Sequence, residues 1–320
     1  MNKQILASAL VLAFVGVAFA HNGVTWFMPT VPDPTAMNID GSEDDWAWFD
    51  MGFAATPEHL EVPQGEGEGM GPNPIPDDFQ ASYRLSWSPP PDNALYFFTR
   101  VSDDTLRSME GDQKDRWWND DVVQLDIDAD HSGGSISGNS IVEECHNGYR
   151  TYFHAQLTKD LGVSVHCRAV DGREWVEAPP WNISSGTITP PDTGNLTGPY
   201  EWTAEGRLTL WDDMDPLADG PETSTRHIFA EDDVIGFSIV YEDGDWEANG
   251  EQSFFTHVGV DGGPGSGIAG ATDADQMMDV HALLTISADD LENYGEYGGG
   301  GTATFVEHTT WARIKNAVAH

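Results

Sequence analysis

The residues best suited to chemistry lie in one stretch, Trp117 to Asp130, which reads WWNDDVVQLDIDAD. Within it Val123, Leu125 and Ile127 alternate with polar residues, and this period of two is typical of a half-buried strand. A tryptophan pair precedes the expected strand, and aspartates overlap its end. Flat aromatic rings can pack against a ligand, and carboxylates can hold a hard cation. The combination favours a binding module over a catalytic pocket.

The aspartates of this stretch are candidate calcium ligands. Asp126, Asp128 and Asp130 repeat at the alternate spacing of calcium loops, but no glutamate completes the EF-hand pattern. One interpretation is a calcium site that combines Asp103, Asp128 or Asp130 with backbone carbonyls. The other is an acidic turn solvated by water, which is the common fate of clustered acids.

No arrangement of residues predicts catalysis, so we expect a non-catalytic protein. Glycoside hydrolysis needs two carboxylates at a defined separation, and pairs such as Glu143-Glu144 arise by chance in a chain this acidic. No nucleophile elbow stands out. A haem-binding sandwich is an alternative, with Met109, Met277 or His281 as axial ligands. Covalent haem is excluded, because the chain has no Cys-x-x-Cys-His.

The N-terminus predicts export. Lys3 supplies a positive end, Ile5 to Phe19 is apolar, and Ala18-Phe19-Ala20 is a small-x-small cleavage site, so residues 1–20 read as a signal peptide. The apolar run is too short to span a membrane comfortably. We expect cleavage near Ala20 and a secreted, periplasmic or cell-surface protein without a membrane span.

The net charge limits the binding partners that the protein can have, and the two cysteines bear on whether it contains a disulfide. The chain carries 54 Asp and Glu against 14 Lys and Arg, a formal charge of −40. Such a chain repels phosphate backbones and anionic membranes, so nucleic acid is not an expected partner. Cys145 and Cys167 are a candidate disulfide in an oxidising compartment. The bridge would require the preceding loop to fold back.

Short β-rich segments separated by Gly, Pro and Asp predict an all-β fold. The expected strands are Ala81–Trp87, Ala94–Val101, Val122–Asp128, Tyr149–Gln156, Val163–Val170, Trp202–Trp211, Val234–Tyr241, Ser253–Val258 and Val280–Ile286. Their spacing is typical of an antiparallel β-sandwich of the jelly-roll kind. Long loop insertions are expected at Pro57–Asp78, Ala129–Asn147, Val176–Pro199 and Asp261–Gln276.

Four regions are expected along the chain. The signal peptide is followed by a lead-in at 21–35 and by the sandwich at 36–297. Residues 298–320 begin with four glycines and continue into a short amphipathic segment. Thr310 can cap a helix there that presents Trp311, Ile314 and Val318 on one face.

The order of segments resembles family 9 carbohydrate-binding modules. The resemblance rests on Asn38–Trp46, Tyr83–Trp87, Ala94–Phe97, Val101–Asp104, Trp118–Asp128 and Val234–Ile239 with Glu242-Asp243, in that order. It covers roughly residues 36–290. It implies a β-sandwich that binds sugars, often at chain ends, and that contains structural calcium.

The resemblance also implies individual sugar contacts. Trp118 falls on one of two tryptophans that sandwich the sugar, although a core or strand-capping role is an alternative for this ring. Trp117 would be the exposed member of its pair. Gln124 falls on a carboxylate position that contacts hydroxyl groups, and Arg150 falls near an arginine that does the same. The stretch from Phe254 to Asp261, where the second clamping ring should lie, contains no tryptophan.

The sequence therefore predicts a secreted protein that captures a polysaccharide or oligosaccharide and is associated with carbohydrate catabolism. Trp246 or Trp181 could replace the missing second ring. The alternative is a structural or surface protein that kept the sandwich and lost the sugar site.

Overall fold

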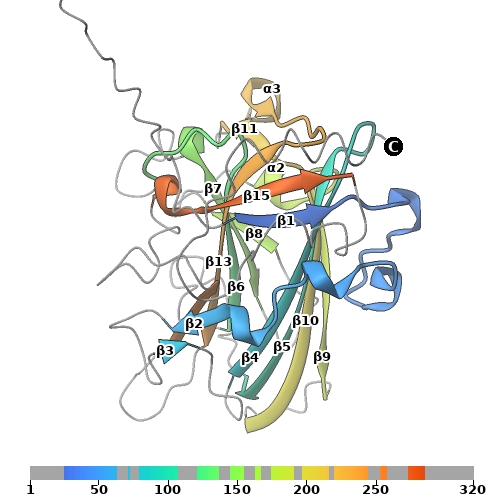
Figure 1. Ribbon diagram of the computed structural model, residues 1–320, viewed down its shortest axis with the longest axis vertical. Coiled ribbons are helices and arrows are strands. Elements are labelled where there is room, and N and C mark those ends of the chain that lie inside the picture. Colours follow the sequence, from blue (N-terminus) through green and yellow to red (C-terminus); the bar gives the residue numbers. More distant parts are fainter. Residues whose placement is uncertain are drawn as a thin grey trace, which may run out of the picture.

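The computed structural model describes residues 25–62, 71–72, 79–106, 121–136, 145–154, 163–166, 174–190, 197–215, 220–243, 253–257 and 273–284. Over these residues the chain is built mainly of strands, which form two sheets that pack face to face (Figure 1). The predicted antiparallel β-sandwich with long loop insertions is confirmed. Residues 298–320, with the expected C-terminal helix, lie outside the described residues.

The first sheet has nine strands, of which β6 and β13 lie in the middle. Its path runs through β3 (Gly71–Pro72), β2 (Leu60–Val62), β14 (Ser253–His257), β13 (Val234–Asp243), β6 (Val122–Asp128), β7 (Tyr149–His154) and β8 (Val163–His166), with β15 (Met278–Leu283) pairing to β13 and β1 (Thr25–Pro29) to β15. The neighbours are antiparallel except β1 and β15, which are parallel. Strand β1 thus joins the sandwich from within the expected lead-in.

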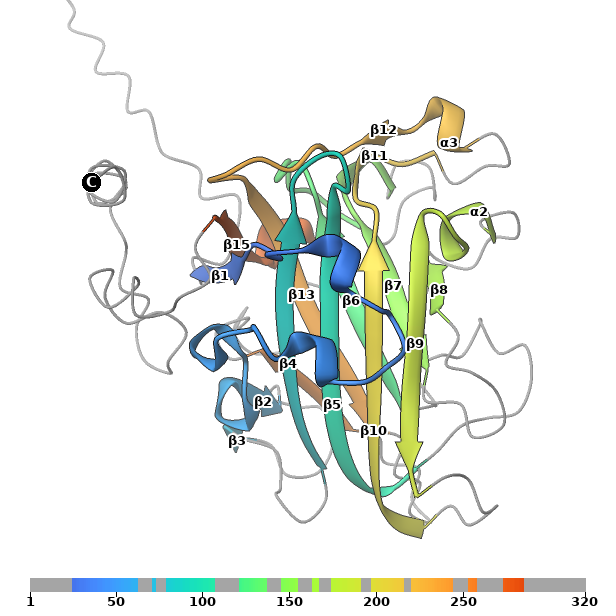
Figure 2. The same cartoon turned by 90° about the vertical axis from the view of Figure 1, so that its right-hand side faces the viewer.

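The second sheet has four antiparallel strands. They are β4 (Phe79–Ser88), β5 (Ala94–Thr105), β10 (Thr197–Leu208) and β9 (Asn182–Thr189), with β9 at the edge (Figure 2). A small third sheet pairs β11 (Trp211–Asp213) with β12 (Thr225–Arg226).

The helices are short and lie in the connections. They are η1 (Pro34–Ala36), η2 (Asp44–Trp46), η3 (Met51–Phe53), η4 (Pro57–His59), α2 (Glu174–Glu177), α3 (Gly220–Thr223) and η7 (Ala274–Gln276). Within the described part of the chain, none has the length and apolar content that a membrane crossing requires.

The nine expected strands all occur, but the expected loop Pro57–Asp78 contains two further short strands, β2 and β3. The expected loop Val176–Pro199 contains the edge strand β9. The expected strand Trp202–Trp211 ends at Leu208, and Trp211 starts the separate strand β11.

Alternating side chains of the two sheets form the main core. On β6 the inward residues are Val123, Leu125 and Ile127, and all three are fully buried. They belong to the same apolar cluster as Tyr83 of β4 and Trp202 of β10. Burying each large apolar side chain contributes about 1.5–3 kcal/mol to folding. This facing contact fixes which side of each strand points outward.

A second apolar cluster covers the outer face of the second sheet. Residues 31–55 cross this face (Figure 2) and bury Trp46, Phe49 and Phe53 against Tyr96 and Phe98 of β5. The Trp46 and Phe98 ring centroids are 5.9 Å apart. The N-terminal segment is therefore part of the folded domain.

Glu205 of β10 ties this covering segment to the sheet. Its Oε1 accepts a hydrogen bond from Trp46 Nε1 at 2.7 Å, and its Oε2 accepts from the backbone N–H groups of Asp40 and Gly41 at 2.9 and 2.8 Å. Gly41 has φ +82, and a Cβ there would lie 2.5 Å from Gly186 Cα of β9. Only glycine fits this close approach without strain.

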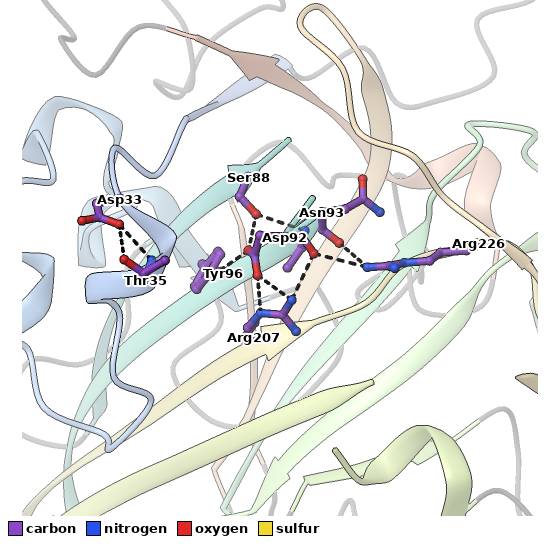
Figure 3. A network of polar contacts seen from close by, with 9 residues as sticks. Asp33, Thr35, Ser88, Asp92, Asn93, Tyr96, Arg207 and Arg226 are labelled. Carbon is purple, nitrogen blue, oxygen red and sulfur yellow. Dashed lines mark hydrogen bonds and ion pairs between the residues drawn. The ribbon is translucent and has the colours of Figure 1, made fainter. Parts of the chain in front are cut away.

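A polar network closes one end of the second sheet (Figure 3). In the turn between β4 and β5, Asp92 accepts hydrogen bonds from Ser88, from the Tyr96 hydroxyl at 2.8 Å and from Arg207 Nη2 at 2.6 Å. Burial acts to raise the pKa of Asp92, but these hydrogen bonds outweigh it and lower the pKa below its ordinary value. Arg226 Nη2 donates to the Asn93 carbonyl at 2.9 Å. The turn is thus held by charged groups from β10 and β12.

We expect Glu205 to make folding stability depend on pH. Burial raises its pKa from 4.5 to about 7, against the opposing hydrogen bonds from Trp46 and Gly41. Between these values the folded state binds a proton that the unfolded state releases, so the contribution of Glu205 to stability rises as pH falls from 7 to 4.5. The gain is at most about 3 kcal/mol.

Urea unfolding of the wild type and Glu205→Gln at pH 8, 6.5 and 5 measures this contribution. The other acids are common to both proteins and cancel in the difference. The stability of the wild type relative to the variant should rise toward pH 5. A difference independent of pH would contradict the assignment.

Candidate functional site

The outer face of the first sheet carries a row of buried polar side chains across three neighbouring strands. Asp126 of β6 lies opposite Arg150 of β7 on one side and Ser238 of β13 on the other. Gln124 precedes Asp126 on the same face of β6, because side chains along a strand alternate. All four residues are buried, with Arg150 the most exposed at 7%. We call these four residues the polar row.

Asp126 is the centre of the polar row. Its carboxylate accepts from Gln124 Nε2 at 2.8 and 2.6 Å, and Arg150 Nε lies 3.1 Å from its Oδ1. Burial raises the pKa of Asp126 to about 7, although the charge of Arg150 and the Gln124 hydrogen bond both act to lower it. The guanidinium and the amide thus support a carboxylate that burial alone would neutralise.

The polar atoms of the row that are buried without a hydrogen bond to the described part of the chain include Gln124 Oε1 and Ser238 Oγ. A buried polar atom without a hydrogen bond costs about 1–3 kcal/mol, so such atoms usually meet water or a ligand. The row therefore offers one acceptor and one hydroxyl to a small polar partner.

A second cluster lies at one end of the core, between the two sheets. Asp103 of β5, Asp121 just before β6 and Asp243 at the end of β13 are all buried. Among the described residues they form a group whose carboxylate oxygens lie within 4.8 Å of one another. Each takes an inward position of its strand, so the apolar stripes of both sheets end in acids. We call this group the acidic cluster.

The donor set of the acidic cluster fits calcium. Calcium prefers oxygen ligands and binds them at 2.3–2.6 Å, so carboxylates a few ångströms apart can share one ion. One Asp103 oxygen also accepts from the Thr105 backbone N–H at 2.9 Å, which orients that carboxylate. Three buried carboxylates this close repel one another strongly when all are charged.

The structure separates the calcium ligands expected from the sequence. Asp103 lies in the acidic cluster, whereas Asp128 and Asp130 lie at the opposite end of β6, roughly 20 Å away at the rise of a strand. Asp128 accepts from the backbone N–H groups of Ser132 and Gly133 at 3.2 and 2.8 Å. These bonds close a turn, so Asp103 cannot share an ion with the other two.

Most of the tryptophans predicted to contact a sugar lie outside the described residues. These are Trp117, Trp118 and Trp246. Trp181 precedes β9 and packs against Trp211, with ring centroids 5.2 Å apart. Its neighbour Asn182 pairs with Leu208, at the end of the second sheet away from Asp103. Trp181 is therefore placed far from the acidic cluster.

The residues predicted as a disulfide or as haem ligands either pack in the folded domain or lie outside the described residues. Cys145 is buried, and Cys167 lies outside the described residues. Of the haem candidates, Met277 is buried in a small apolar cluster with Ile136 and Ala274, and His281 contacts the ring of Phe27. Met109 is not described.

Sequence reasoning missed four members of these two groups. Asp126 was considered only as part of the aspartate run, and Ser238 looked like an ordinary strand residue. Asp121 and Asp243 end inward-facing stripes of their strands, and that alternation was the available signal. Their meeting depends on the pairing of β6 with β13, which local patterns do not reveal.

Comparisons with known proteins give structural matches only. No family model and no curated protein matches the chain. A family 9 carbohydrate-binding module from Caldicellulosiruptor kristjanssonii in complex with glucose superposes with TM-score 0.49 at 12% identity, over 82% of this chain and 96% of that chain. A family 9 carbohydrate-binding module from the same organism in complex with cellotriose gives TM-score 0.48 at 12% identity, over 82% of this chain and 94% of that chain.

We expect Asp126 and Arg150 to be strongly coupled in stability. Asp126→Leu leaves a buried guanidinium beside an apolar group, and Arg150→Met leaves a buried carboxylate, so each should cost about 3 kcal/mol or more. The double variant should cost clearly less than the sum. Urea unfolding of the four proteins measures the coupling, with exposed Asp130→Ala as the control. Additive losses would contradict a direct pair.

Proposed function

We propose that the protein is a secreted, non-catalytic carbohydrate-binding protein that holds a sugar of a polysaccharide or oligosaccharide at the polar row. The observation that carries the proposal is a pair of buried polar atoms, Gln124 Oε1 and Ser238 Oγ, that have no hydrogen-bond partner among the described residues. Sugar hydroxyls suit them because each hydroxyl can donate to one atom and accept from another.

The charges around the polar row favour a neutral ligand. Asp126 already neutralises Arg150 at 3.1 Å, and Glu242, buried on the same face, adds a further acid. An acidic sugar would meet these carboxylates without a spare counter-charge, in a chain whose formal charge is −40. Neutral sugars avoid this repulsion.

The apolar part of the proposed site comes from Trp118, with Trp117 beside it. A pyranose has an apolar face that packs against a flat ring, while groups around its edge take hydrogen bonds. Trp118 belongs to the connection between β5 and β6, shortly before Gln124 in the sequence. The N-terminal signal supports the proposal of export, and a role in carbohydrate catabolism is proposed with it.

We also propose structural calcium at the acidic cluster. The ion would join β5 of one sheet to β6 and β13 of the other, and would remove the repulsion among Asp103, Asp121 and Asp243. The connection that carries Trp118 ends at Asp121, so a bound ion would also fix the position of its C-terminal end.

Sugar binding can be measured directly on the mature chain. We expect retardation in affinity electrophoresis by at least one neutral polysaccharide, and heat on titration with its oligosaccharides. Gln124→Ala removes one buried hydrogen-bonding group and should weaken binding about tenfold, or roughly 1.4 kcal/mol. Trp118→Ala should weaken it at least as much.

Ser185→Ala, on β9 of the other sheet, is the matched control and should bind like the wild type. The panel should include neutral and acidic glucans and xylans, each with and without 1 mM calcium. No binding to any member under either condition would remove the proposal.

Calcium should stabilise the protein through the acidic cluster. At a calcium concentration of about 100 times Kd the gain is about 2.7 kcal/mol, visible as a higher Tm than in EDTA. Asp121→Asn should lose this gain. In EDTA the same variant should be at least as stable as the wild type, because one of three repelling carboxylates is gone.

Asp130→Asn, at the other end of β6, is the control for the calcium measurement and should keep the full shift. Thermal unfolding of the three proteins in calcium and in EDTA decides the matter. Equal shifts in all three, or no shift in the wild type, would place calcium elsewhere or nowhere.

A further inference from the structure

We propose that Asp126 is a positioning residue that decides which end of the Gln124 amide faces the sugar, so that the polar row selects a ligand hydroxyl that donates. This inference rests on the proposed sugar-binding function and adds a residue that sets its specificity. Asp126 is assigned this role through its two hydrogen bonds from Gln124 Nε2.

The orientation of Gln124 follows from hydrogen-bond chemistry. A side-chain amide has an oxygen that only accepts and a nitrogen that only donates, and an ionised carboxylate only accepts. Gln124 Nε2 lies 2.8 and 2.6 Å from the two carboxylate oxygens of Asp126. Turning the amide over would bring Oε1 against the carboxylate and replace two hydrogen bonds with a repulsion. Asp126 therefore holds the nitrogen inward.

Arg150 keeps Asp126 in place for this task. Its Nε lies 3.1 Å from Oδ1, and both side chains are buried, with 8% and 0% of their side-chain surfaces exposed. Opposite charges attract one another more strongly when they are buried away from water. The carboxylate is thus held between an arginine of β7 and an amide of its own strand, and it cannot easily turn away from Gln124.

The atom left over on Gln124 is an acceptor. With Nε2 committed to Asp126, Oε1 remains without a partner in the described part of the chain, and so does Ser238 Oγ. Ser238 stands directly opposite Asp126, at the usual Cβ separation of about 4.5–5.5 Å for such a pair. A ligand atom must bring a hydrogen to Oε1. A sugar hydroxyl does so, whereas an ether oxygen or a fluorine does not.

Fluorinated sugars can separate donation from acceptance. A deoxy sugar lacks both functions at one position, and a fluorodeoxy sugar keeps only a weak acceptor. The probes are methyl β-D-glucopyranoside with its monodeoxy and monofluorodeoxy analogues, titrated by calorimetry into the mature wild type, Asp126→Asn and the control Asp130→Asn. The measured quantity is the ratio of Kd for each analogue to Kd for the parent glucoside.

In the wild type we expect one ring position at which the deoxy and fluorodeoxy sugars both bind about tenfold more weakly. In Asp126→Asn the neighbouring amide accepts either orientation of Gln124, so the fluorodeoxy penalty at that position should shrink at least threefold. Asp130→Asn should keep the wild-type ratio. If Asp126→Asn weakens all sugars by one common factor, Asp126 is only structural and the proposal is overturned.

A measurement without sugar keeps the proposal testable if the variant fails to fold or no glucoside binds. The side-chain amide protons of Gln124 can be assigned in nitrogen-15 spectra from their loss in Gln124→Ala. In the wild type they should be shifted downfield and protected from exchange with water. Freely exchanging protons would overturn the orientation. A protein with protected protons and no sugar affinity would instead remove the proposed function and leave the orientation standing.

Discussion

The burial of β6 on both of its faces is the constraint on which the rest of this structure depends. All seven residues of the strand are buried, although three of them, Gln124, Asp126 and Asp128, are polar. The apolar half forms the contact between the sheets. The polar side chains must therefore form hydrogen bonds within the protein, because a buried polar group without a hydrogen bond destabilises the fold. The ion pair of Asp126 with Arg150, and the amide bound to it, answer that requirement.

Acidic residues lie at both ends of β6, but their surroundings differ. At the end near Asp128, backbone N–H groups of a turn take up the carboxylate, and the charge is satisfied locally. At the other end Asp121 continues the inward stripe and meets acids from two other strands. A local turn can be satisfied by its own backbone, whereas the acidic cluster joins distant parts of the chain and suits a cation.

The sequence pattern predicted the parts of the fold that depend on short-range alternation. The bounds of β6 agree at both ends, because apolar and polar residues alternate from Val123 to Asp128 and Val122 precedes them. The edge strand β9 was missed because Asn182–Thr189 has no apolar stripe, and pairing on one side only leaves much of it exposed. Gln124 and Arg150 were both expected at the site, and the structure places each beside Asp126. The sequence alone did not indicate that Asp103 lies beside Asp121 and Asp243, since the register of β5, β6 and β13 is set by long-range packing.

The two sheets each bury a carboxylate on their outer face, and the difference between them indicates which face is built for a ligand. Glu205 has both oxygens occupied by N–H groups of the segment that covers it, so that face is closed by the chain itself. Asp126 is equally well supported, but its support leaves Gln124 Oε1 and Ser238 Oγ without partners in the described residues. A face that only stabilises the fold would gain from satisfying these atoms, as the other sheet does. Their presence, in a row fixed by an ion pair, supports the proposal that a ligand binds on the first sheet.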